Sequence, residues 1–347
     1  MNYKKLLSDI GVDSLVFMTD GSRIDANFYY FTGLSKSIQV TSTVIITTNG
    51  PLTITNRLEE RIFSGRKIVI ENRGQAENAM RKHTGKTVCV DYSSLSARRL
   101  FHFRKILKGK RIVDISDKMG AIRGVKAQSE IKKVMEACRI AEEVAEGMEK
   151  LASLSRSEKD LADEIAHASR RNGAEDMSFP PIVAAGKNSA VAHHVPGKAK
   201  LNGMLLVDFG AIYEGYCSDL TRMFYIGKAD GRSKRIYGII YSAQQAAIAS
   251  AKEGAKASDI HRAADDILKE KLGQKMIHSV GHGLGIEVHE FPGVSEKSNA
   301  VLKKNSIITI EPGYYKAGWG GVRIEDDIRI GKKAILLSKA PSSIIEI

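Results

Sequence analysis

The 347-residue sequence predicts an α+β protein of two domains, a smaller N-terminal α/β domain over residues 1–121 and a larger domain over residues 122–347. Three observations support this prediction. The chain exceeds the usual length of a single domain. Short strand-like and helical stretches alternate up to about residue 120, as in a mixed sheet covered by helices. Around Gly120–Lys126 the alternation gives way to a long amphipathic helix and a strand-rich region.

Six short strands are expected in the N-terminal domain, at Ser14–Met18, Thr41–Thr47, Leu52–Thr55, Ile68–Glu71, Val88–Tyr92 and Arg111–Ile115. The second and third strands should form a hairpin, because Asn49-Gly50-Pro51 between them is a strong turn signal. The aromatic run Phe28–Phe31, directly before Thr32-Gly33, indicates core residues followed by a turn more than a platform for a ligand.

The C-terminal domain begins with apolar residues at helical spacing, which predict one helix over residues 127–151. Ser157 and Asp160 mark the capped start of a second helix that runs to about Arg171. Further strands are expected within 182–226, at Ser306–Glu311 and at Val322–Ile330, and further helices at Ser233–Lys252 and at Ser258–Leu272 with Ser258 as N-cap. Two halves, each a strand pair followed by helices, would suit a pseudo-twofold domain.

Composition is that of an ordinary soluble protein. Cys89, Cys138 and Cys217 are odd in number and lack C-x-x-C spacing, which argues against a disulfide framework and for a reducing compartment. The N-terminus reaches an acidic residue before an apolar core of secretory length develops, and no run approaches the ~18 apolar residues of a membrane span. We therefore expect a cytoplasmic protein without a membrane partner.

The formal net charge of +13 raises the question of a nucleic-acid partner. Residues 1–123 contain 21 Lys and Arg against 11 Asp and Glu, a net charge of +10. The densest run, Arg98–Arg111, has seven basic residues and no acidic one. Its apolar residues recur at helical spacing, so we interpret it as an amphipathic surface helix with a basic outer face. The alternative is a phosphate-rich or acidic partner, whose binding would weaken steeply with salt.

Asp208 and Asp219 are two carboxylates within strand-like sequence. A buried strand face tolerates a carboxylate only when a cation or several hydrogen bonds compensate its charge. Three more polar residues lie in apolar strand sequence or beside glycine, which makes the set Asp208, Asp219, His282, Glu311 and Glu325. Each residue alone could be an ordinary turn, edge or loop residue. Their order and context together favour a shared site.

Four carboxylates without metal would repel one another, and their pKa values would rise. Two divalent cations would make the set nearly neutral. Oxygen ligands with one imidazole suit Mn, Co, Fe or Zn, and paired metals ~3.5–4 Å apart activate a water for hydrolysis. The set therefore predicts a hydrolase with two divalent metal ions per subunit.

The motifs around these residues resemble those of the pita-bread metallopeptidases, the family of methionine aminopeptidase, aminopeptidase P and prolidase. In that family the ligands occur in the order Asp, Asp, His, Glu, Glu. The matching segments are Val207–Gly210, Ser218–Arg222, Gly281–Gly285, Ile310–Gly313 and Val322–Asp327. The resemblance is strong over residues 122–347 and weak over the N-terminal domain. It implies a pita-bread catalytic domain preceded by a creatinase-like α/β domain.

By this resemblance, Asp208 would bind one metal and His282 and Glu311 the other, while Asp219 and Glu325 would bridge both. The hydroxide between the metals would attack the scissile carbonyl, with Glu311 as the proton shuttle.

Two further histidines match family residues near the substrate, His193 and His289. His194 is interpreted as a bystander, although the tandem leaves the choice between His193 and His194 open. Arg323 lies two residues before Glu325 and hence on the same face of a predicted strand. There its guanidinium could order the carboxylates and the substrate.

The Arg-x-Glu-Asp-Asp signature and the N-terminal domain resemble the proline-specific branch, Xaa-Pro dipeptidase or Xaa-Pro aminopeptidase. Some prolidases carry an arginine where this sequence has Gly293, so strict dipeptide preference is left open. The segment Asn27–Gly33 resembles the loop that approaches a neighbouring subunit's site, which implies a homodimer.

The sequence thus predicts a cytoplasmic, dinuclear-metal exopeptidase that hydrolyses the Xaa-Pro bond at the N-terminus of dipeptides or short peptides. Methionine aminopeptidase-like activity is the first alternative, and Arg323 argues against it. The second alternative is a non-enzymatic basic binding module on the same fold. Because all five metal ligands of the family are present, we do not expect nucleic acid to be the main partner.

Overall fold

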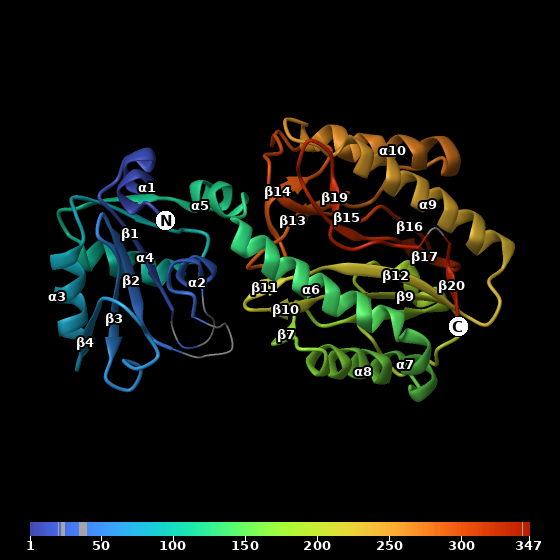
Figure 1. Ribbon diagram of the computed structural model, residues 1–347, viewed down its shortest axis with the longest axis horizontal. Coiled ribbons are helices and arrows are strands. Elements are labelled where there is room, and N and C mark those ends of the chain that lie inside the picture. The colour runs from blue at the N-terminus through green and yellow to red at the C-terminus, as the bar shows by residue number, and fades with distance from the viewer. Residues whose placement is uncertain (20, 22–24, 35–39, 342) are drawn as a thin grey trace. The chain divides into compact units, whose positions relative to one another are not determined.

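The computed structural model describes residues 1–347 apart from 20, 22–24, 35–39 and 342. The chain divides into two compact units, Met1–Ile122 and Arg123–Ile347 (Figure 1). In the part of the chain that is described, no helix combines the length and apolar composition that a membrane span requires.

The N-terminal unit is built on one mixed sheet. In its described residues the strand order is β4-β3-β2-β1-β5-β6, and only β2 runs antiparallel to its neighbours. The strands are β1 (Ser14–Met18), β2 (Thr43–Thr47), β3 (Gly50–Asn56), β4 (Lys67–Ile70), β5 (Thr87–Val90) and β6 (Arg111–Asp114). Each of the six strands expected from the sequence is therefore present.

Helices pack against this sheet. They are α1 (Tyr3–Ile10), α2 (Ala26–Thr32), α3 (Arg73–His83), α4 (Ala97–Ile106) and α5 (Ser116–Arg123). Asp25 caps α2 by accepting the Phe28 N–H at 2.8 Å, and the helix ends at Gly33 with φ +67°. The aromatic run in α2 is mostly buried, so it is core followed by a turn, as expected. In α4 the buried residues are Phe103 and Ile106, which leaves the basic residues on the outer face.

The C-terminal unit begins with α6 (Gln128–Glu146), α7 (Met148–Leu154) and α8 (Glu158–Arg171). The prediction of one helix over residues 127–151 is wrong, because the chain breaks at Gly147 and restarts. Glycine is a poor helix former, and the Gly147 carbonyl accepts the Leu151 N–H to open α7. The start of α8 agrees with the sequence, since Ser157 accepts the Asp160 N–H at 3.2 Å.

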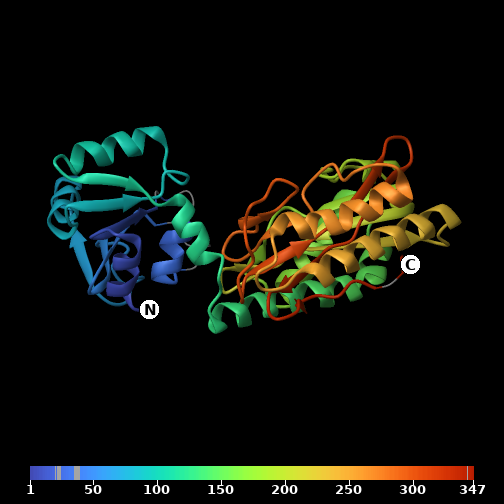
Figure 2. The same cartoon turned by 90° about the horizontal axis from the view of Figure 1, so that it is seen from above.

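Two further helices, α9 (Gly231–Ser250) and α10 (Ala257–Leu272), run side by side (Figures 1 and 2). The prediction of Ser258 as the N-cap of α10 is wrong. Lys256 occupies that position and forms no side-chain cap bond. The Ala257 N–H instead donates to the Ala300 carbonyl at 2.9 Å, so a remote segment satisfies the helix start.

Strands of the C-terminal unit form two main sheets in the described part of the chain. One has the order β20-β12-β9-β8 and the other the order β14-β13-β15-β18-β19. Their members are β8 (Ile182–Ala185), β9 (Gly203–Phe209), β12 (Leu220–Ile226), β13 (Gly281–Gly283), β14 (Glu290–Val294), β15 (Ile307–Ile310), β18 (Asp326–Arg329), β19 (Ile335–Leu336) and β20 (Ile345–Glu346). A small three-stranded sheet has the order β11-β10-β7, with β7 (Asp176–Met177), β10 (Ala211–Tyr213) and β11 (Tyr216–Cys217). A two-stranded sheet pairs β16 (Gly313–Lys316) with β17 (Gly320–Arg323).

The predicted strand Val322–Ile330 is in fact two strands in different sheets, β17 and β18. Between them the backbone leaves the ladder, since the Glu325 N–H donates to the Thr221 carbonyl at 3.2 Å. Glu325 therefore belongs to neither strand and lies directly before β18.

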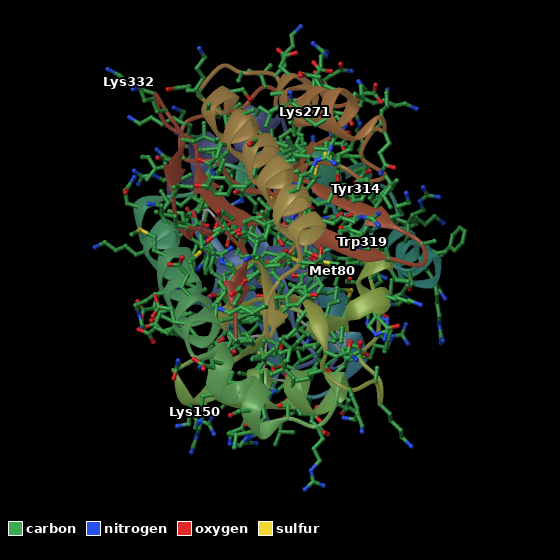
Figure 3. All side chains as sticks on the ribbon, turned by 90° about the vertical axis from the view of Figure 1, so that its right-hand side faces the viewer. Met80, Lys150, Lys271, Tyr314, Trp319 and Lys332 are labelled. Atoms are coloured by element: carbon green, nitrogen blue, oxygen red, sulfur yellow. The ribbon has the colours of Figure 1, made fainter. Side chains whose placement is uncertain are left out.

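Side chains of β9 alternate between two hydrophobic clusters. Leu205, Val207 and Phe209 pack with α6–α8, whereas Met204 and Leu206 pack with α9 and α10. The sheets therefore lie between two helical layers (Figure 1). Lysines such as Lys150, Lys271 and Lys332 project outward from this unit (Figure 3).

We expect Gly210→Ala to lower the free energy of unfolding by about 1–3 kcal/mol. A Cβ at Gly210 would lie 1.8 Å from the Ser218 carbonyl oxygen, so the backbone would have to move. The matched change Gly238→Ala lies inside α9, where the Cβ meets no described atom within 4 Å. It should stabilise the protein by about 1 kcal/mol. Denaturant unfolding of both variants checks the prediction, and equal effects would contradict it.

Candidate active site

Three polar side chains share one face of the first sheet. Asp208 and Thr221 are cross-strand partners of β9 and β12. Asp219 precedes Thr221 by two residues and so points to the same side. This is also the side of Met204 and Leu206, toward α9, α10 and the second sheet.

The second sheet contributes His282 from β13, Glu311 directly after β15 and Glu325 directly before β18. Two glycines flank His282 and allow this placement. A Cβ at Gly281 would lie 2.0 Å from the Thr309 carbonyl oxygen, and one at Gly283 would lie 2.4 Å from that of Phe291. Residues with side chains would push β13 away from its neighbours.

The predicted metal-binding residues come together at this point. His282 Nε2 lies 3.6 Å from Asp219 Oδ2 and 3.7 Å from Glu311 Oε1. Ligand atoms of Asp219, His282 and Glu325 all lie within 4.8 Å of one another. His282 Nδ1 is 3.1 Å from the Gly283 carbonyl. An Nδ1–H that donates there leaves the Nε2 lone pair directed at the carboxylates, as in metal-binding histidines.

The acids of this cluster repel one another in a buried space. Burial, and then neighbouring acids, raise the pKa values of Asp219 and Glu325 well above their usual range. Burial also raises the pKa of Glu311 to about 8, against the charge of Arg323. Burial lowers the pKa of His282 to about 4. These shifts are those expected where several acids share one buried space.

The surroundings of the Asp208 carboxylate also show whether a cation would fit at this site. Burial raises its pKa, although Arg323 opposes that shift. Asp208 Oδ2 accepts a hydrogen bond from Arg323 Nη2, while the buried Oδ1 has no partner among the described residues. A buried oxygen without a partner costs free energy, and a divalent cation would satisfy it. The residues present therefore fit a metal centre.

Arg323 connects several of these groups from the end of β17. Its Nη2 lies 2.5 Å from Asp208 Oδ2, and its Nε donates to Thr221 Oγ1 at 3.0 Å. The Thr221 hydroxyl donates in turn to Glu325 Oε2 at 2.7 Å. Arg323 and Glu325 do not share a strand face as the sequence predicted. They meet through Thr221, because the chain turns between β17 and β18.

His193 and His289, which the sequence predicts to lie near the substrate, are exposed. His194 is partly buried. The His289 ring lies 4.2 Å from the His282 ring, centre to centre. His193 lies close enough to Asp208 and His289 for its charge to lower their pKa values, although burial is the largest effect on each. His194 turns elsewhere and places Nε2 2.8 Å from Glu158 Oε2.

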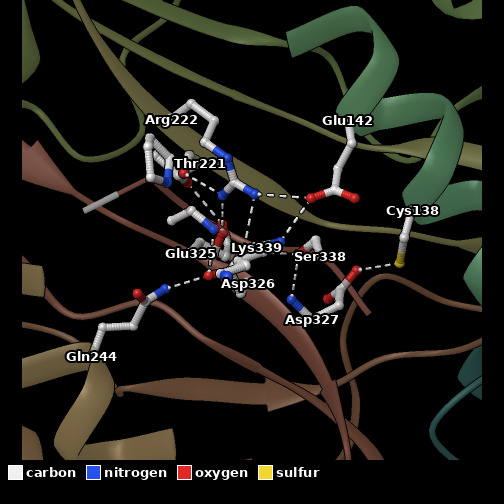
Figure 4. A network of polar contacts seen from close by, with 12 residues as sticks. Cys138, Glu142, Thr221, Arg222, Gln244, Glu325, Asp326, Asp327, Ser338 and Lys339 are labelled. Atoms are coloured by element: carbon white, nitrogen blue, oxygen red, sulfur yellow. Dashed lines mark hydrogen bonds and ion pairs between the residues drawn. The ribbon is translucent and has the colours of Figure 1, made fainter. Parts of the chain in front are cut away.

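A layer of polar residues that the sequence analysis did not assign supports Asp219 and Glu325 (Figure 4). Arg222 Nη1 donates to the Glu325 carbonyl at 2.6 Å, and Nη2 donates to Asp326 Oδ1 at 2.9 Å. Asp327 Oδ2 accepts the Asp219 N–H at 2.9 Å. A signal for these residues was available, since each lies one to three residues beyond a candidate ligand.

Tyr315 is another residue that the sequence analysis missed. Its hydroxyl accepts from Arg323 Nη1 at 2.8 Å and lies 3.1 Å from His278 Nε2. No local pattern distinguishes it from Tyr314, which packs in the core. Its role depends on the contact with β17.

A buried carboxylate, that of Glu290, holds the segment that contains His289. Glu290 Oε1 lies 2.5 Å from Arg123 Nη2, and Oε2 lies 3.1 Å from Lys126 Nζ. Burial alone would raise the pKa of Glu290, but the charges of Lys126 and Arg123 lower it to about 2. The Glu287 N–H also donates to Oε1 at 3.1 Å. Residues 287–290 are thereby fixed around His289.

Two family models match this chain. The model described as Metallopeptidase family M24 matches residues 132–332, and the Creatinase/Prolidase N-terminal domain matches residues 2–125. The chain belongs to metallopeptidase family M24. Its C-terminal unit has the pita-bread fold, and the predicted membership of this family and of its proline-specific branch is confirmed.

Proteins that are similar in sequence or in structure support the membership of this chain in family M24. Xaa-Pro dipeptidase of Pyrococcus furiosus is 35% identical over 240 residues, which span 68% of this chain and 69% of that protein. The structure of X-Pro aminopeptidase from Thermotoga maritima has a TM-score of 0.90 at 27% identity and covers 100% of both chains. Prolidase from Pyrococcus horikoshii has a TM-score of 0.87 at 29% identity, over 98% of this chain and 97% of that one.

We expect Thr221→Val to weaken binding of divalent metal by roughly 10- to 100-fold, because residues that orient metal ligands contribute about that much. The change conserves volume but removes the hydroxyl between Arg323 and Glu325. Titration calorimetry with Mn²⁺ measures the affinity. The control is Thr55→Val, which removes a buried hydroxyl of the N-terminal unit that bonds to Ser42. Unchanged affinity in Thr221→Val would contradict the role of this hydroxyl.

We expect Glu290→Gln to destabilise the protein at pH 7 by up to about 3 kcal/mol. The folded pKa of Glu290, about 2, lies below the unfolded value of about 4.3. Its ionisation therefore stabilises the fold above the unfolded pKa, and this contribution is lost as pH falls toward the folded pKa.

Denaturant unfolding between pH 7 and pH 2 should show the difference between Glu290→Gln and the natural protein shrinking below about pH 5. The exposed Glu296, which pairs with Lys275, provides the control. Glu296→Gln should leave stability unchanged at every pH. A Glu290→Gln penalty that is constant with pH would show that ionisation of Glu290 contributes nothing.

Proposed function

We propose that this chain is a dinuclear-metal exopeptidase that hydrolyses the Xaa-Pro bond at the N-terminus of dipeptides or short peptides. The observation that carries this proposal is the buried cluster of four carboxylates and one imidazole with Arg323 beside it. Relatives named as Xaa-Pro dipeptidase, prolidase and X-Pro aminopeptidase support the choice of substrate.

The proposed metal ligands are Asp208, Asp219, His282, Glu311 and Glu325, with Asp219 and Glu325 shared between the two ions. Two divalent ions, whether Mn, Co, Fe or Zn, would supply Lewis acidity and lower the pKa of a water in the site. The second layer keeps the ligands in place, since Arg222 fixes the Glu325 backbone and Asp327 fixes that of Asp219.

Proton transfer falls to Glu311. An Xaa-Pro amide nitrogen carries no hydrogen, so the departing proline nitrogen must receive a proton before it leaves as a free amine. Glu311 is the carboxylate proposed for this transfer, because its Oε1 lies at the edge of the cluster, 3.7 Å from His282 Nε2, and a carboxylate can take up a proton and release it again. In this proposal the exposed imidazoles of His193 and His289 donate to the scissile carbonyl region, and Arg323 holds Asp208 in position.

The length of peptide that the site accepts depends on the residues that surround the proline carboxylate of a dipeptide, or the residue after proline in a longer peptide. Gly293, in β14, stands where some prolidases carry an arginine, and a Cβ at this position would meet no described atom within 4 Å. We therefore keep both dipeptides and longer peptides within the proposal. We further propose a domain boundary after residue 121 and a homodimer, the latter on the resemblance of Asn27–Gly33. The three buried thiols support a cytoplasmic location.

Asp219→Ala and Glu325→Ala should each reduce metal-dependent release of proline to the level of metal-free protein, because each removes a ligand shared by both ions. Release of proline from Ala-Pro, and of Pro-Ala from Ala-Pro-Ala, is measured with enzyme loaded separately with Mn, Co, Fe and Zn. The exposed Asp259 of α10 provides the control, and Asp259→Ala should keep full activity.

Full activity of a metal-stripped Asp219→Ala, Glu325→Ala double variant would overturn the proposed mechanism. A preference for Ala-Pro-Ala over Ala-Pro would identify an aminopeptidase and reject strict dipeptidase activity. Cleavage of Met-Ala in place of both peptides would identify a methionine aminopeptidase instead.

A further inference from the structure

Glu158 is a fully buried carboxylate outside the metal cluster. It is the first residue of α8, where the N-terminal end of the helix favours a negative charge. Four groups donate to it. Ala185 N and Asn188 Nδ2 reach Oε1 at 2.8 Å each, and His194 Nε2 and Gly197 N reach Oε2 at 2.8 and 3.2 Å.

These donors all belong to the segment 185–197, named here the histidine loop, which contains the tandem His193-His194. Backbone bonds tie the same loop to α8, since the Lys159 N–H donates to the Gly197 carbonyl at 3.0 Å. Burial alone would raise the pKa of Glu158, but the hydrogen bonds from the loop lower it below its usual value. Glu158 therefore stays ionised and keeps accepting from the loop.

The opposite side of the histidine loop contacts β17, the strand that ends at Arg323. The Gly321 N–H donates to Ser189 Oγ at 2.8 Å, and Arg323 Nη1 donates to the Ala192 carbonyl at 3.1 Å. A Cβ at Gly321 would lie 2.2 Å from the Ser189 carbonyl oxygen, so the two backbones touch. The loop is thus held between Glu158 on one side and the group that binds Asp208 on the other.

His193 and His194 have different surroundings because of this arrangement. His194 is partly buried and points to Glu158. His193 is exposed and lies close to Asp208 and His289. We propose that Glu158 is a positioning residue that, by binding His194 and the histidine loop, holds His193 at the metal cluster. This inference rests on the proposed peptidase function for the role of His193, but the placement of His193 can be tested without it.

Glu158→Gln should disturb this placement while conserving shape. The Gln side chain retains one acceptor oxygen for Ala185 N and Asn188. Its NH₂ group would face His194 Nε2 and the Gly197 N–H, both of which now donate to Glu158. His194→Ala removes the same contact from the loop side and leaves the buried carboxylate intact, so one of the two variants tests the proposal if the other fails to fold.

The decisive measurement is a double-mutant cycle on the full chain loaded with Mn²⁺, with Ala-Pro and Ala-Pro-Ala as substrates. Glu158→Gln and His194→Ala should each lower kcat/KM by roughly 10- to 100-fold, the usual effect of an orienting residue. Combined with His193→Ala, either change should add less than about twofold, because His193 is then already absent. Penalties that multiply in the double variants would overturn the proposal.

A second readout does not depend on activity. In protein labelled with ¹⁵N-histidine, Glu158→Gln should shift the ring resonances of both His193 and His194, whereas His282 keeps its signal. The control is Asp265→Asn, another buried helix carboxylate that accepts a backbone N–H, from Met276 at 2.7 Å. It should leave His193 unchanged.

The two readouts separate the possible failures. An unshifted His193 in Glu158→Gln would overturn the inference even if the natural protein cleaves Xaa-Pro peptides. Absence of cleavage by the natural protein would overturn the proposed function, and the resonance shifts would still decide whether Glu158 positions His193.

Discussion

Four buried carboxylates around a single imidazole are the constraint on which the C-terminal unit depends. Burial raises the pKa of each of the four carboxylates. Arg323 supplies one positive charge to the cluster, and it is itself held by Thr221, Tyr315 and the Ala192 carbonyl. Such a concentration of negative charge is stable only if the acids take up protons or further cations neutralise them. The surrounding polar residues hold these side chains in place.

Buried acids hold the two segments that contain the exposed histidines His193 and His289. Glu158 accepts four N–H groups from the segment that contains His193, and Glu290 binds Arg123, Lys126 and the backbone beside His289. In both cases a carboxylate with several donors remains ionised although it is buried. A flexible loop could not hold an imidazole at a fixed distance from the cluster. These two acids hold the segments that carry His193 and His289, and both rings stay exposed.

The sequence-based errors have two causes, a local one and the influence of remote segments. The helix expected over residues 127–151 breaks locally, at Gly147, whereas the start of α10 is satisfied by the remote Ala300 carbonyl rather than by Ser258. The strand expected at Val322–Ile330 turns where the Glu325 N–H finds the Thr221 carbonyl. Periodicity and capping rules describe a segment by itself. They fail where a tertiary hydrogen bond replaces the local one.

The sequence by itself determined the α+β organisation, the N-terminal strands and the family, because periodic burial and polar residues in apolar strands are local signals. It also singled out the five candidate ligands by their context. Only the tertiary structure decided that Thr221 joins Arg323 to Glu325 and that His193 rather than His194 faces the cluster. Those outcomes depend on contacts between residues far apart in the chain, which neighbouring sequence does not encode.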